Sequence, residues 1–351
     1  NRLPLTAYRP MPAISVIILN YNGARWLQRC LSSLQAQTIF SQLEVIIADN
    51  ASTDGSDHDA ALALASWPNG RFIQHGSNLG FCEGNNRAAL QAQGQYLFFL
   101  NNDTWLEPDC LEILLRETQS HQAHAATPIM LNYEDDSVQS AGAAGFDAFG
   151  LMSFALPQKQ TEPIFVAGGC CYLIERQLFH QLHGFDPTFY LYAEEYDLSW
   201  RLWLSGHKAV AVPTARLHHR TAAVTSSTGT TQIQTNDSRR YYTNRNGLWV
   251  IAKNAQHLLL LLLPLQLALL TLEAFASLLL VRRLSFIQHA YLHAVRDAWR
   301  ALPHIRAERQ RFRSLRQRSD LWMLRFFKLR LNRWDSLLFL RRHGLPKVNP
   351  R

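Results

Sequence analysis

Short apolar runs alternate with amphipathic stretches over the first 110 residues of the chain. The runs are rich in β-branched and aromatic residues, which predicts buried strands, and the stretches between them carry apolar residues at helical spacing. Helices that separate buried strands are typical of a mostly parallel sheet with helices on both faces. The predicted strands are 13–19, 43–48, 71–75 and 95–100, and the predicted helices are about 24–37, 53–66 and 83–93.

Polar motifs stand where three of these predicted strands end. Asn20-Tyr21-Asn22 follows the first strand, Asp49 begins a DNASTD motif after the second, and Asn101-Asn102-Asp103 follows the strand at 95–100. In open α/β sheets, ligands bind beyond the carboxyl ends of the strands, so we expect these motifs to line one crevice. Amides, hydroxyls and a few carboxylates suit a nucleotide whose phosphates are held through a metal ion. The pattern therefore predicts an enzyme that uses a nucleotide sugar.

The pattern changes between residues 125 and 255. Ile164–Ile174 predicts a strand that is interrupted at Gly168 and Gly169, where a ligand can approach the backbone closely. A helix is expected over 194–204, followed by a strand over 208–212. Residues 221–236 are rich in Ser and Thr and contain few core-forming residues, which predicts a mobile loop or lid.

The C-terminal part of the chain is first apolar and then basic. Residues 258–281 are almost continuously apolar and long enough to span a bilayer, although Pro264, Gln266 and Glu273 argue against a span. Residues 285–342 combine aromatic side chains, leucines and arginines at helical spacing, which is typical of helices in the interface of an anionic membrane. The alternatives are a true span and a helical bundle packed on the rest of the protein. The apolar positions of this pattern include Trp299, Phe312, Leu315, Trp322, Phe326, Phe327, Trp334 and Leu338.

Composition and charge agree with a folded protein that has a basic C-terminal region. Of the 351 residues, 47% are hydrophobic and 18% charged, which excludes a disordered chain. The net charge of +8 divides into +14 for residues 282–351 and −6 for the remainder, so an anionic partner is expected for the C-terminal region alone. No nucleic-acid-binding module accompanies this charge, so we expect no nucleic-acid partner. The five cysteines form no CxxC pair, which favours a reduced cytosolic compartment.

Asp103 is the main candidate for holding a metal ion. It follows a buried strand directly, and a hard cation such as Mg²⁺ or Mn²⁺ usually takes one or two protein carboxylates together with substrate phosphates. The alternative is that Asp103 caps a helix over 106–115. His219, or alternatively its neighbour His218, could complete the metal shell or contact the diphosphate, although paired surface histidines are common.

Other polar residues of the expected crevice suit the base, the ribose and the phosphates. Ser52 and Asp54 could instead cap the next helix, and Arg87 could pair with a surface carboxylate rather than a phosphate. Arg239, Arg240 and Arg245 are further candidates for phosphate contacts. The predicted nucleotide-sugar contacts are Asn20, Asn22, Asp49, Ser52, Asp54, Asn78, Gly80, Arg87, Asn102 and Asp103.

Three carboxylates crowd the start of the helix predicted over 194–204. Glu194, Glu195 and Asp197 repel one another, a helix N-terminus offsets negative charge, and Arg201 lies one turn from Asp197. A carboxylate that faces the crevice would be ionised at neutral pH, as a general base must be. The alternative is a solvated, acidic helix start. The candidates for the acceptor side or for a supporting role are Gly168, Gly169, Glu194, Asp197 and Arg201.

Together these motifs resemble the family 2 glycosyltransferases, whose nucleotide-sugar-binding, Rossmann-like fold is called GT-A. The resemblance covers about residues 13–255 and rests on five motifs in family order. It implies that Asp49 and Asp54 contact the base and ribose, and that Asn101-Asn102-Asp103 corresponds to the DxD metal motif with only its last acid retained. It also implies that Glu195 is the catalytic base, at a position where the family more often has Asp.

Within this family the chain is most similar to the bacterial rhamnosyltransferases. The similar segments are NLGFCEGNNRA, YAEEYDLSWRL, LHHRTA and RYYTNRNGLWVIAKN, the last followed by the apolar run and the basic helices. The resemblance implies dTDP-rhamnose as donor, a polyprenyl-diphosphate-linked or nascent surface glycan as acceptor, and Mg²⁺ or Mn²⁺ as cofactor. It also implies a location at the cytoplasmic face of the inner membrane, as a peripheral or monotopic protein.

These features predict an inverting, metal-dependent glycosyltransferase with two regions, a GT-A catalytic domain over 1–255 and a membrane-associated helical region over 256–351. A UDP-sugar-dependent transferase of the same family and a catalytically inactive scaffold on this fold are the alternatives. A processive polysaccharide synthase is disfavoured because the chain has no QxxRW motif. A nucleotidyltransferase is disfavoured because NYNGARW is not a glycine-rich GxGxR loop.

Overall fold

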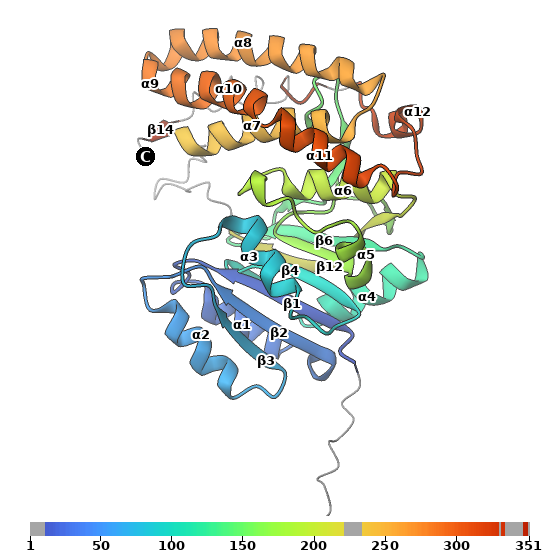
Figure 1. Cartoon of the computed structure of the whole chain (residues 1–351). Helices are drawn as coiled ribbons and strands as arrows, with labels where there is room; N and C mark the ends of the chain where they lie inside the picture. Colours follow the sequence, from blue (N-terminus) through green and yellow to red (C-terminus); the bar gives the residue numbers. More distant parts are fainter. Residues whose placement is uncertain (1–10, 221–233, 330, 334–346, 350–351) are drawn as a thin grey trace, which may run out of the picture.

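The computed structural model describes residues 11–220, 234–329, 331–333 and 347–349. A central sheet lies beneath a layer of C-terminal helices (Figure 1). The strands are β1 (Ile14–Asn20), β2 (Leu43–Asp49), β3 (Gly70–Gln74), β4 (Tyr96–Asn101), β5 (Thr104–Leu106), β6 (Ala125–Asn132), β7 (Val138–Ser140), β8 (Ala143–Phe146), β9 (Met152–Phe154), β10 (Glu162–Pro163), β11 (Cys171–Glu175), β12 (Ala209–His219), β13 (Gln234–Asn236) and β14 (Lys347–Asn349).

The sheet has a parallel half and a mixed half. Its strand order is β10-β12-β6-β11-β4-β1-β2-β3, with β5 paired to β12 and β7 paired to β6. The pairs β4-β1, β1-β2 and β2-β3 are parallel, as the alternation of strands and helices predicts. β11 lies between β4 and β6 and is antiparallel to both, so "mostly parallel" describes only one half of the sheet.

Helices cover both faces of this sheet, as predicted. On one face, α1 (Leu27–Gln35), α2 (Ser56–Ala65) and α4 (Cys110–Ser120) bury leucines and alanines against the strands. On the other face, α3 (Gly80–Ala89), α5 (Arg176–Gln181) and α6 (Glu194–Leu204) share a second core rich in aromatic side chains. The burial of both faces explains why the parallel strands read as continuous apolar runs.

The strand that carries the histidine pair is longer than the one predicted from the sequence. The predicted strand over 208–212 continues to His219, with a register shift between Val212 and Arg216. His218 and His219 therefore lie within β12, although the predicted strand ended at residue 212. Because successive side chains of a strand point to opposite faces, the two histidines cannot share one site. Most of the predicted lid at 221–236 lies outside the described residues.

The C-terminal part of the chain forms a layer of helices around α7 (Asp237–Asn254). This layer contains α8 (Leu262–Val281), α9 (Leu284–Ile287), the π-helical turn η4 (Gln288–His293), α10 (Ala294–Arg300), α11 (Leu302–Phe312) and α12 (Asp320–Met323). α7 packs on α6 of the sheet domain as well as on α8, η4, α10 and α11 (Figure 1). The basic helices therefore pack on the body of the protein, as the bundle interpretation expects. Trp334 and Leu338 of the predicted pattern lie outside the described residues.

α8 is apolar on its outer face and polar toward the protein. Leu272, Phe275 and Leu279 are 68%, 64% and 73% exposed. Gln266 is buried, and Glu273 forms an ion pair with Arg240 at 3.5 Å. Of the three residues that argued against a span, Gln266 and Glu273 thus face the interior, whereas Pro264 is exposed. Within the described residues, Leu259–Val281 is the one helical stretch long and apolar enough to cross a membrane, on length and composition alone, and 22% of its most apolar window is buried.

Candidate active site

Asn20 connects the ends of the three central strands. Its side-chain Nδ2 donates to Asp49 Oδ1 at 2.8 Å, and its Oδ1 accepts from Asn102 Nδ2 at 2.8 Å. Asp49 is fully buried and also accepts from the Ser52 hydroxyl at 2.6 Å. The structure therefore brings the three strand-end motifs to one edge of the sheet, where the parallel order β4-β1-β2 places them side by side.

A second set of bonds holds the loops after β1 and β2 against each other. Asn22 Oδ1 accepts from the Thr53 amide at 2.8 Å, and Asp54 Oδ2 accepts from the Ala24 amide at 2.9 Å. Asn22 has a left-handed backbone (φ 52°), which an asparagine tolerates better than most residues. These residues shape the rim of the crevice. Asp54 also accepts from the amide and hydroxyl of Ser56, the first residue of α2, although the N-cap position of this helix is Gly55.

The segment around Gly80 lies on the opposite side of the crevice. Asn78 Oδ1 accepts from the Gly80 amide at 2.9 Å and from Asn50 Nδ2 at 3.3 Å. Gly80 has φ of 75°, and a side chain there would collide with the ring of Tyr190. Arg87 forms an ion pair with Glu83 at 2.7 Å on α3, as its alternative interpretation expects.

Asp103 lies beside His219 at the end of the sheet. Asp103 Oδ1 and His219 Nε2 are 3.5 Å apart, and the Asp103 side chain is 28% exposed. His219 Nδ1 meets Gln139 Oε1 at 2.7 Å, which fixes the orientation of the imidazole ring. Burial raises the pKa of Asp103, and the neighbouring His219 opposes this shift.

His218 points away from Asp103. Its ring stacks on Trp105 with centroids 3.6 Å apart, and its Nδ1 lies 3.1 Å from Asp136 Oδ1. Of the two histidines, the structure therefore offers His219 as the partner of Asp103. Arg220 follows His219, and its amide donates to the Asp103 carbonyl at 3.1 Å; its guanidinium pairs with Glu134 at 3.6 Å and lies over the Trp26 ring. The sequence analysis did not single out Arg220, although it is adjacent to the histidine pair.

Asp103 and His219 fit a divalent ion that is shared with a substrate diphosphate. Hard cations such as Mg²⁺ commonly take one or two protein ligands and complete their shell with phosphate oxygens and water. Within the described residues, no cluster of three or more His, Cys, Asp or Glu side chains forms a complete protein cage. A shared site of this kind explains why a single acid of the motif could suffice.

Glu195 lies at the start of α6 and faces the glycine pair. A Cβ atom on Gly169 would be 3.2 Å from Glu195 Cδ and 3.5 Å from its Oε2, so the absence of a side chain at Gly169 leaves room for the carboxylate. Cys170, the next residue, accepts from the Asn101 amide at 3.1 Å. Glu195 is thereby placed near the strand end that carries Asp103.

The two glutamates at the start of α6 differ in environment. Glu194 is buried, and its Oε2 has no hydrogen-bond partner, whereas Glu195 is partly exposed. Burial, together with the charge of Glu195, raises the pKa of Glu194 well above its ordinary value. Burial also raises the pKa of Glu195. Of the two carboxyl groups, Glu194 is therefore the one whose neutral form is favoured more strongly, and the pKa of Glu195 is moved toward the range useful for a general base.

Asp197 and Arg201 form a buried network behind α6. Arg201 Nη2 donates to Asp197 Oδ2 at 2.7 Å, and Lys253 Nζ bonds to Asp197 at 3.1 Å and to Asp186 at 2.7 Å. Although burial opposes ionisation, these two cations hold the pKa of Asp197 below its ordinary value. The expected pair of Asp197 and Arg201 is present, and it joins α6 to α7 rather than facing the crevice.

Residues of α7 hold the backbone that leads into Glu194. Tyr190, Tyr192 and Ala193 all have positive φ, which is a strained conformation for residues with side chains. Asn246 Nδ2 lies 3.1, 2.8 and 2.7 Å from the carbonyls of residues 189, 191 and 192, and Arg245 donates to the carbonyls of residues 188 and 189. The donors of Arg245 are thus used within the protein. This supporting role could not be predicted from the sequence, because the NRNG segment of α7 does not indicate which distant carbonyls it contacts.

The other two arginines of this segment also contact protein groups. Arg240 pairs with Glu273, and the Arg239 guanidinium lies 5.9 Å from the centre of the Tyr192 ring. Arg245 is therefore the member of the set that bonds to the loop preceding Glu194, and Arg239 approaches the same loop at Tyr192.

Comparisons with known proteins support a glycosyltransferase. The sequence profile of glycosyl transferase family 2 matches residues 15–182. An N-acetylglucosaminyl-diphospho-decaprenol L-rhamnosyltransferase of Mycobacterium tuberculosis is 27% identical over 237 residues, which cover 59% of this chain and 76% of that protein. The O-antigen biosynthesis protein RfbC of Myxococcus xanthus is 29% identical over 233 residues, which cover 61% of this chain and 18% of that protein.

Solved structures show the same fold at low sequence identity. GalNAc-T7, crystallised with UDP, GalNAc and Mn²⁺, superposes with a TM-score of 0.64 at 17% identity, over 97% of this chain and 59% of that chain. Residues 1–349 of S. aureus TarS, in complex with UDP, give a TM-score of 0.56 at 16% identity, over 86% of this chain and 89% of that chain. Residues 15–182 therefore match glycosyl transferase family 2, and the chain has a GT-A fold.

Proposed function

We propose that this glycosyltransferase moves rhamnose from dTDP-rhamnose to a polyprenyl-diphosphate-linked glycan, with inversion at the anomeric carbon and with the help of Mg²⁺ or Mn²⁺. The observation that carries the proposal is the position of Glu195, a partly exposed carboxylate packed against Gly169 at the strand end that also bears Asp103. The name of the mycobacterial relative supports both the sugar and the lipid-linked acceptor.

In the proposed reaction, Glu195 accepts the proton of the acceptor hydroxyl. The acceptor oxygen forms its bond to the anomeric carbon as the bond between that carbon and the phosphate oxygen breaks, and the nucleoside diphosphate leaves with the electron pair. A divalent ion, when bound, offsets the charge that develops on this leaving group. Asp103 and His219 would hold the ion, and Arg220 adds positive charge beside them. One displacement gives one inversion, and the protein needs no nucleophile of its own.

We further propose that residues 1–255 form the catalytic domain and that residues 256–351 place it on the cytoplasmic face of an anionic membrane. The support is the outer face of α8, where leucines and Phe275 are exposed while Gln266 and Glu273 face inward. Apolar surface of this kind beside arginines is typical of helices that lie in a membrane interface. This location would bring the crevice to a lipid-linked acceptor.

The donor is tested by thermal unfolding of the protein with dTDP, UDP and GDP, each with and without Mn²⁺. A ligand at 100 times its dissociation constant stabilises the folded state by about 2.7 kcal/mol, which gives a clear shift. We expect dTDP with Mn²⁺ to stabilise more than UDP does. A preference for UDP, the nucleotide bound in both solved relatives, would replace the rhamnose donor with a UDP-sugar. A response to none of the three would favour the inactive scaffold.

A further inference from the structure

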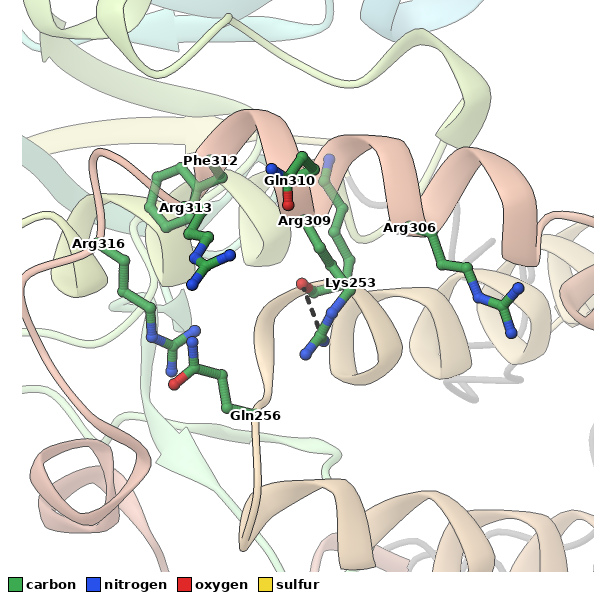
Figure 2. Close-up of a pocket in the computed structure, with 8 residues that line it drawn as sticks. All are labelled: Lys253, Gln256, Arg306, Arg309, Gln310, Phe312, Arg313 and Arg316. Atoms are coloured by element: carbon green, nitrogen blue, oxygen red, sulfur yellow. Dashed lines mark hydrogen bonds between the residues drawn. The ribbon is translucent and has the colours of Figure 1, made fainter.

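A basic pocket lies on the side of the helical layer, between α11 and the end of α7 (Figure 2). We call it the arginine pocket, and its volume is about 260 Å³. This is too small for a nucleotide sugar and suits a single compact anionic group. The pocket is lined by Lys253, Gln256, Arg306, Arg309, Gln310, Phe312, Arg313 and Arg316.

The arginines that line this pocket come from one segment of the chain. Positions 306, 309, 313 and 316 follow one another at intervals of three or four residues; Arg306 and Arg309 lie on one face of α11, and Arg313 and Arg316 follow just after this helix ends at Phe312. Figure 2 shows the guanidinium groups of Arg309, Arg313 and Arg316 directed toward the end of α7, whereas that of Arg306 extends away from them at the other end of the pocket lining. The spacing is visible in the sequence, although the sequence analysis treated these arginines only as part of a basic region.

Two of the four arginines have a structural role. Arg309 donates to the carbonyl of Ala252 at 2.7 Å, and Arg316 donates to the carbonyl of Asn254 at 2.7 Å and to Asp320 at 2.8 Å. These are the unpaired carbonyls and the negative dipole end of α7, which cations stabilise. Capping alone therefore accounts for Arg309 and Arg316.

Arg306 and Arg313 do not take part in this capping. Both side chains are exposed, and neither forms an ion pair with any residue that the structure describes. Lys253 forms ion pairs with Asp186 and Asp197, and Asp320 forms an ion pair with Arg316. No carboxylate lines the pocket, so an anion that enters it would meet a net positive charge.

The linker that borders the pocket leads directly to exposed apolar residues. Gln256 lines the pocket, Leu258 follows two residues later, and Leu261 and Leu265 continue onto α8. These leucines are 42%, 61% and 46% exposed. An anionic group held in the pocket would therefore have apolar protein surface next to it, as the headgroup of a lipid has its acyl chains.

We propose that the arginine pocket binds the phosphate of an anionic membrane lipid. Guanidinium groups bind phosphate oxygens in pairs and are weakly hydrated, which suits a partly desolvated site at a membrane surface. The inference rests on the membrane contact of the proposed function and names the residues and the chemical group that make it.

The pocket also has a defined relation to the active site. Lys253 lines the pocket and bonds to Asp197, two residues after Glu195. Along α7, Lys253 is seven residues from Asn246, which corresponds to about 10 Å at the helical rise of roughly 1.5 Å per residue. A lipid phosphate bound here would thus fix the height of the crevice above the membrane.

The proposal is tested by co-sedimentation with vesicles of phosphatidylcholine, with and without phosphatidylglycerol. The test variant is Arg306→Gln with Arg313→Gln, whose side chains form no ion pair with a described residue. The matched control is Arg300→Gln with Arg311→Gln, which removes two exposed charges of the same helical layer outside the pocket. Each basic residue near an anionic membrane contributes about fivefold to binding, so the test variant should bind anionic vesicles roughly 30-fold more weakly.

The control variant should lose no more than about fivefold if the pocket, rather than diffuse charge, binds the lipid. Equal losses for the two variants, or no loss for either, would overturn the proposal. Inorganic pyrophosphate serves as the soluble probe in thermal unfolding. If it stabilises the wild type but not the test variant, while vesicle binding is unchanged, the ligand is a soluble phosphate and the lipid assignment is wrong.

The same samples separate this proposal from the proposed function. The test variant should keep its stabilisation by dTDP with Mn²⁺, because Arg306 and Arg313 lie outside the crevice. Loss of the nucleotide response in the wild type would contradict the donor assignment and leave the vesicle result to decide the pocket.

Discussion

Replacing Glu195 with glutamine is expected to lower the turnover number about 100-fold or more, while binding of the nucleotide is preserved. The amide cannot accept the proton of the acceptor hydroxyl, and general-base catalysis contributes roughly 10²–10⁴ to the rate. The substitution keeps the size of the side chain, so its packing against Gly169 should be unchanged. The measurement is the steady-state rate with saturating donor and acceptor, together with the thermal shift produced by dTDP and Mn²⁺.

Glu194→Gln is the matched control for this variant. Burial and the charge of Glu195 raise the pKa of Glu194, which favours the neutral carboxylic acid, and an amide is a close replacement for that form. Its turnover should therefore remain near that of the wild type. If Glu194→Gln were inactive and Glu195→Gln active, the base would be Glu194. Full activity in both variants would remove the base from this helix altogether.

Replacing Asp103 with asparagine is expected to abolish most of the Mn²⁺-dependent part of nucleotide binding. The variant keeps the shape of the side chain but loses the charge that lies 3.5 Å from His219 and that a divalent ion would require. In thermal unfolding, dTDP should stabilise the variant about equally with and without Mn²⁺. The wild type should show a clear difference of up to about 2.7 kcal/mol at 100 times the dissociation constant.

Asp136→Asn is the control for Asp103→Asn. Asp136 is an exposed carboxylate that contacts His218 on the opposite side of β12, and asparagine tolerates its positive φ. Its removal should leave the Mn²⁺ dependence intact. Undiminished Mn²⁺ dependence in Asp103→Asn would instead assign the metal to other ligands.

The sequence predicted those parts of the fold that depend on local pattern. The strands at 14–20, 43–49 and 96–101 and the helix at 194–204 lie within one residue of their expected positions, because burial on both faces and charge at a helix start leave clear patterns. The three strand-end motifs could be placed together because consecutive parallel strands end at the same edge of a sheet.

The pairing of strands that are distant in the sequence could not be predicted from the local pattern of residues. The antiparallel insertion of β11 and the extension of β12 to His219 depend on partners more than 40 residues away, so neither the mixed half of the sheet nor the separation of His218 from His219 could be anticipated. The partner of Arg87 lies one turn away on the same helix, and that alternative was visible in the sequence.

The support of the loop before Glu194 by α7 could not be predicted either, because the partners are distant in the sequence. Asn246 lies more than 50 residues from the carbonyls that it holds, and a single asparagine in a helix carries no signal for such a role. The sequence also did not predict which face of α8 is directed toward the protein. Gln266 and Glu273 argue against a membrane span in the sequence, but in the structure both are directed inward, so they leave the outer face apolar.

The most direct test of the central claim is the anomeric configuration of the product, determined by proton NMR after transfer from dTDP-rhamnose to a polyprenyl-diphosphate-linked acceptor in the presence of Mn²⁺. A single displacement assisted by Glu195 predicts a glycosidic bond of the opposite anomeric configuration to that of the donor. A product with the configuration of the donor would require a second displacement and would contradict the assignment of Glu195 as the base of a one-step transfer.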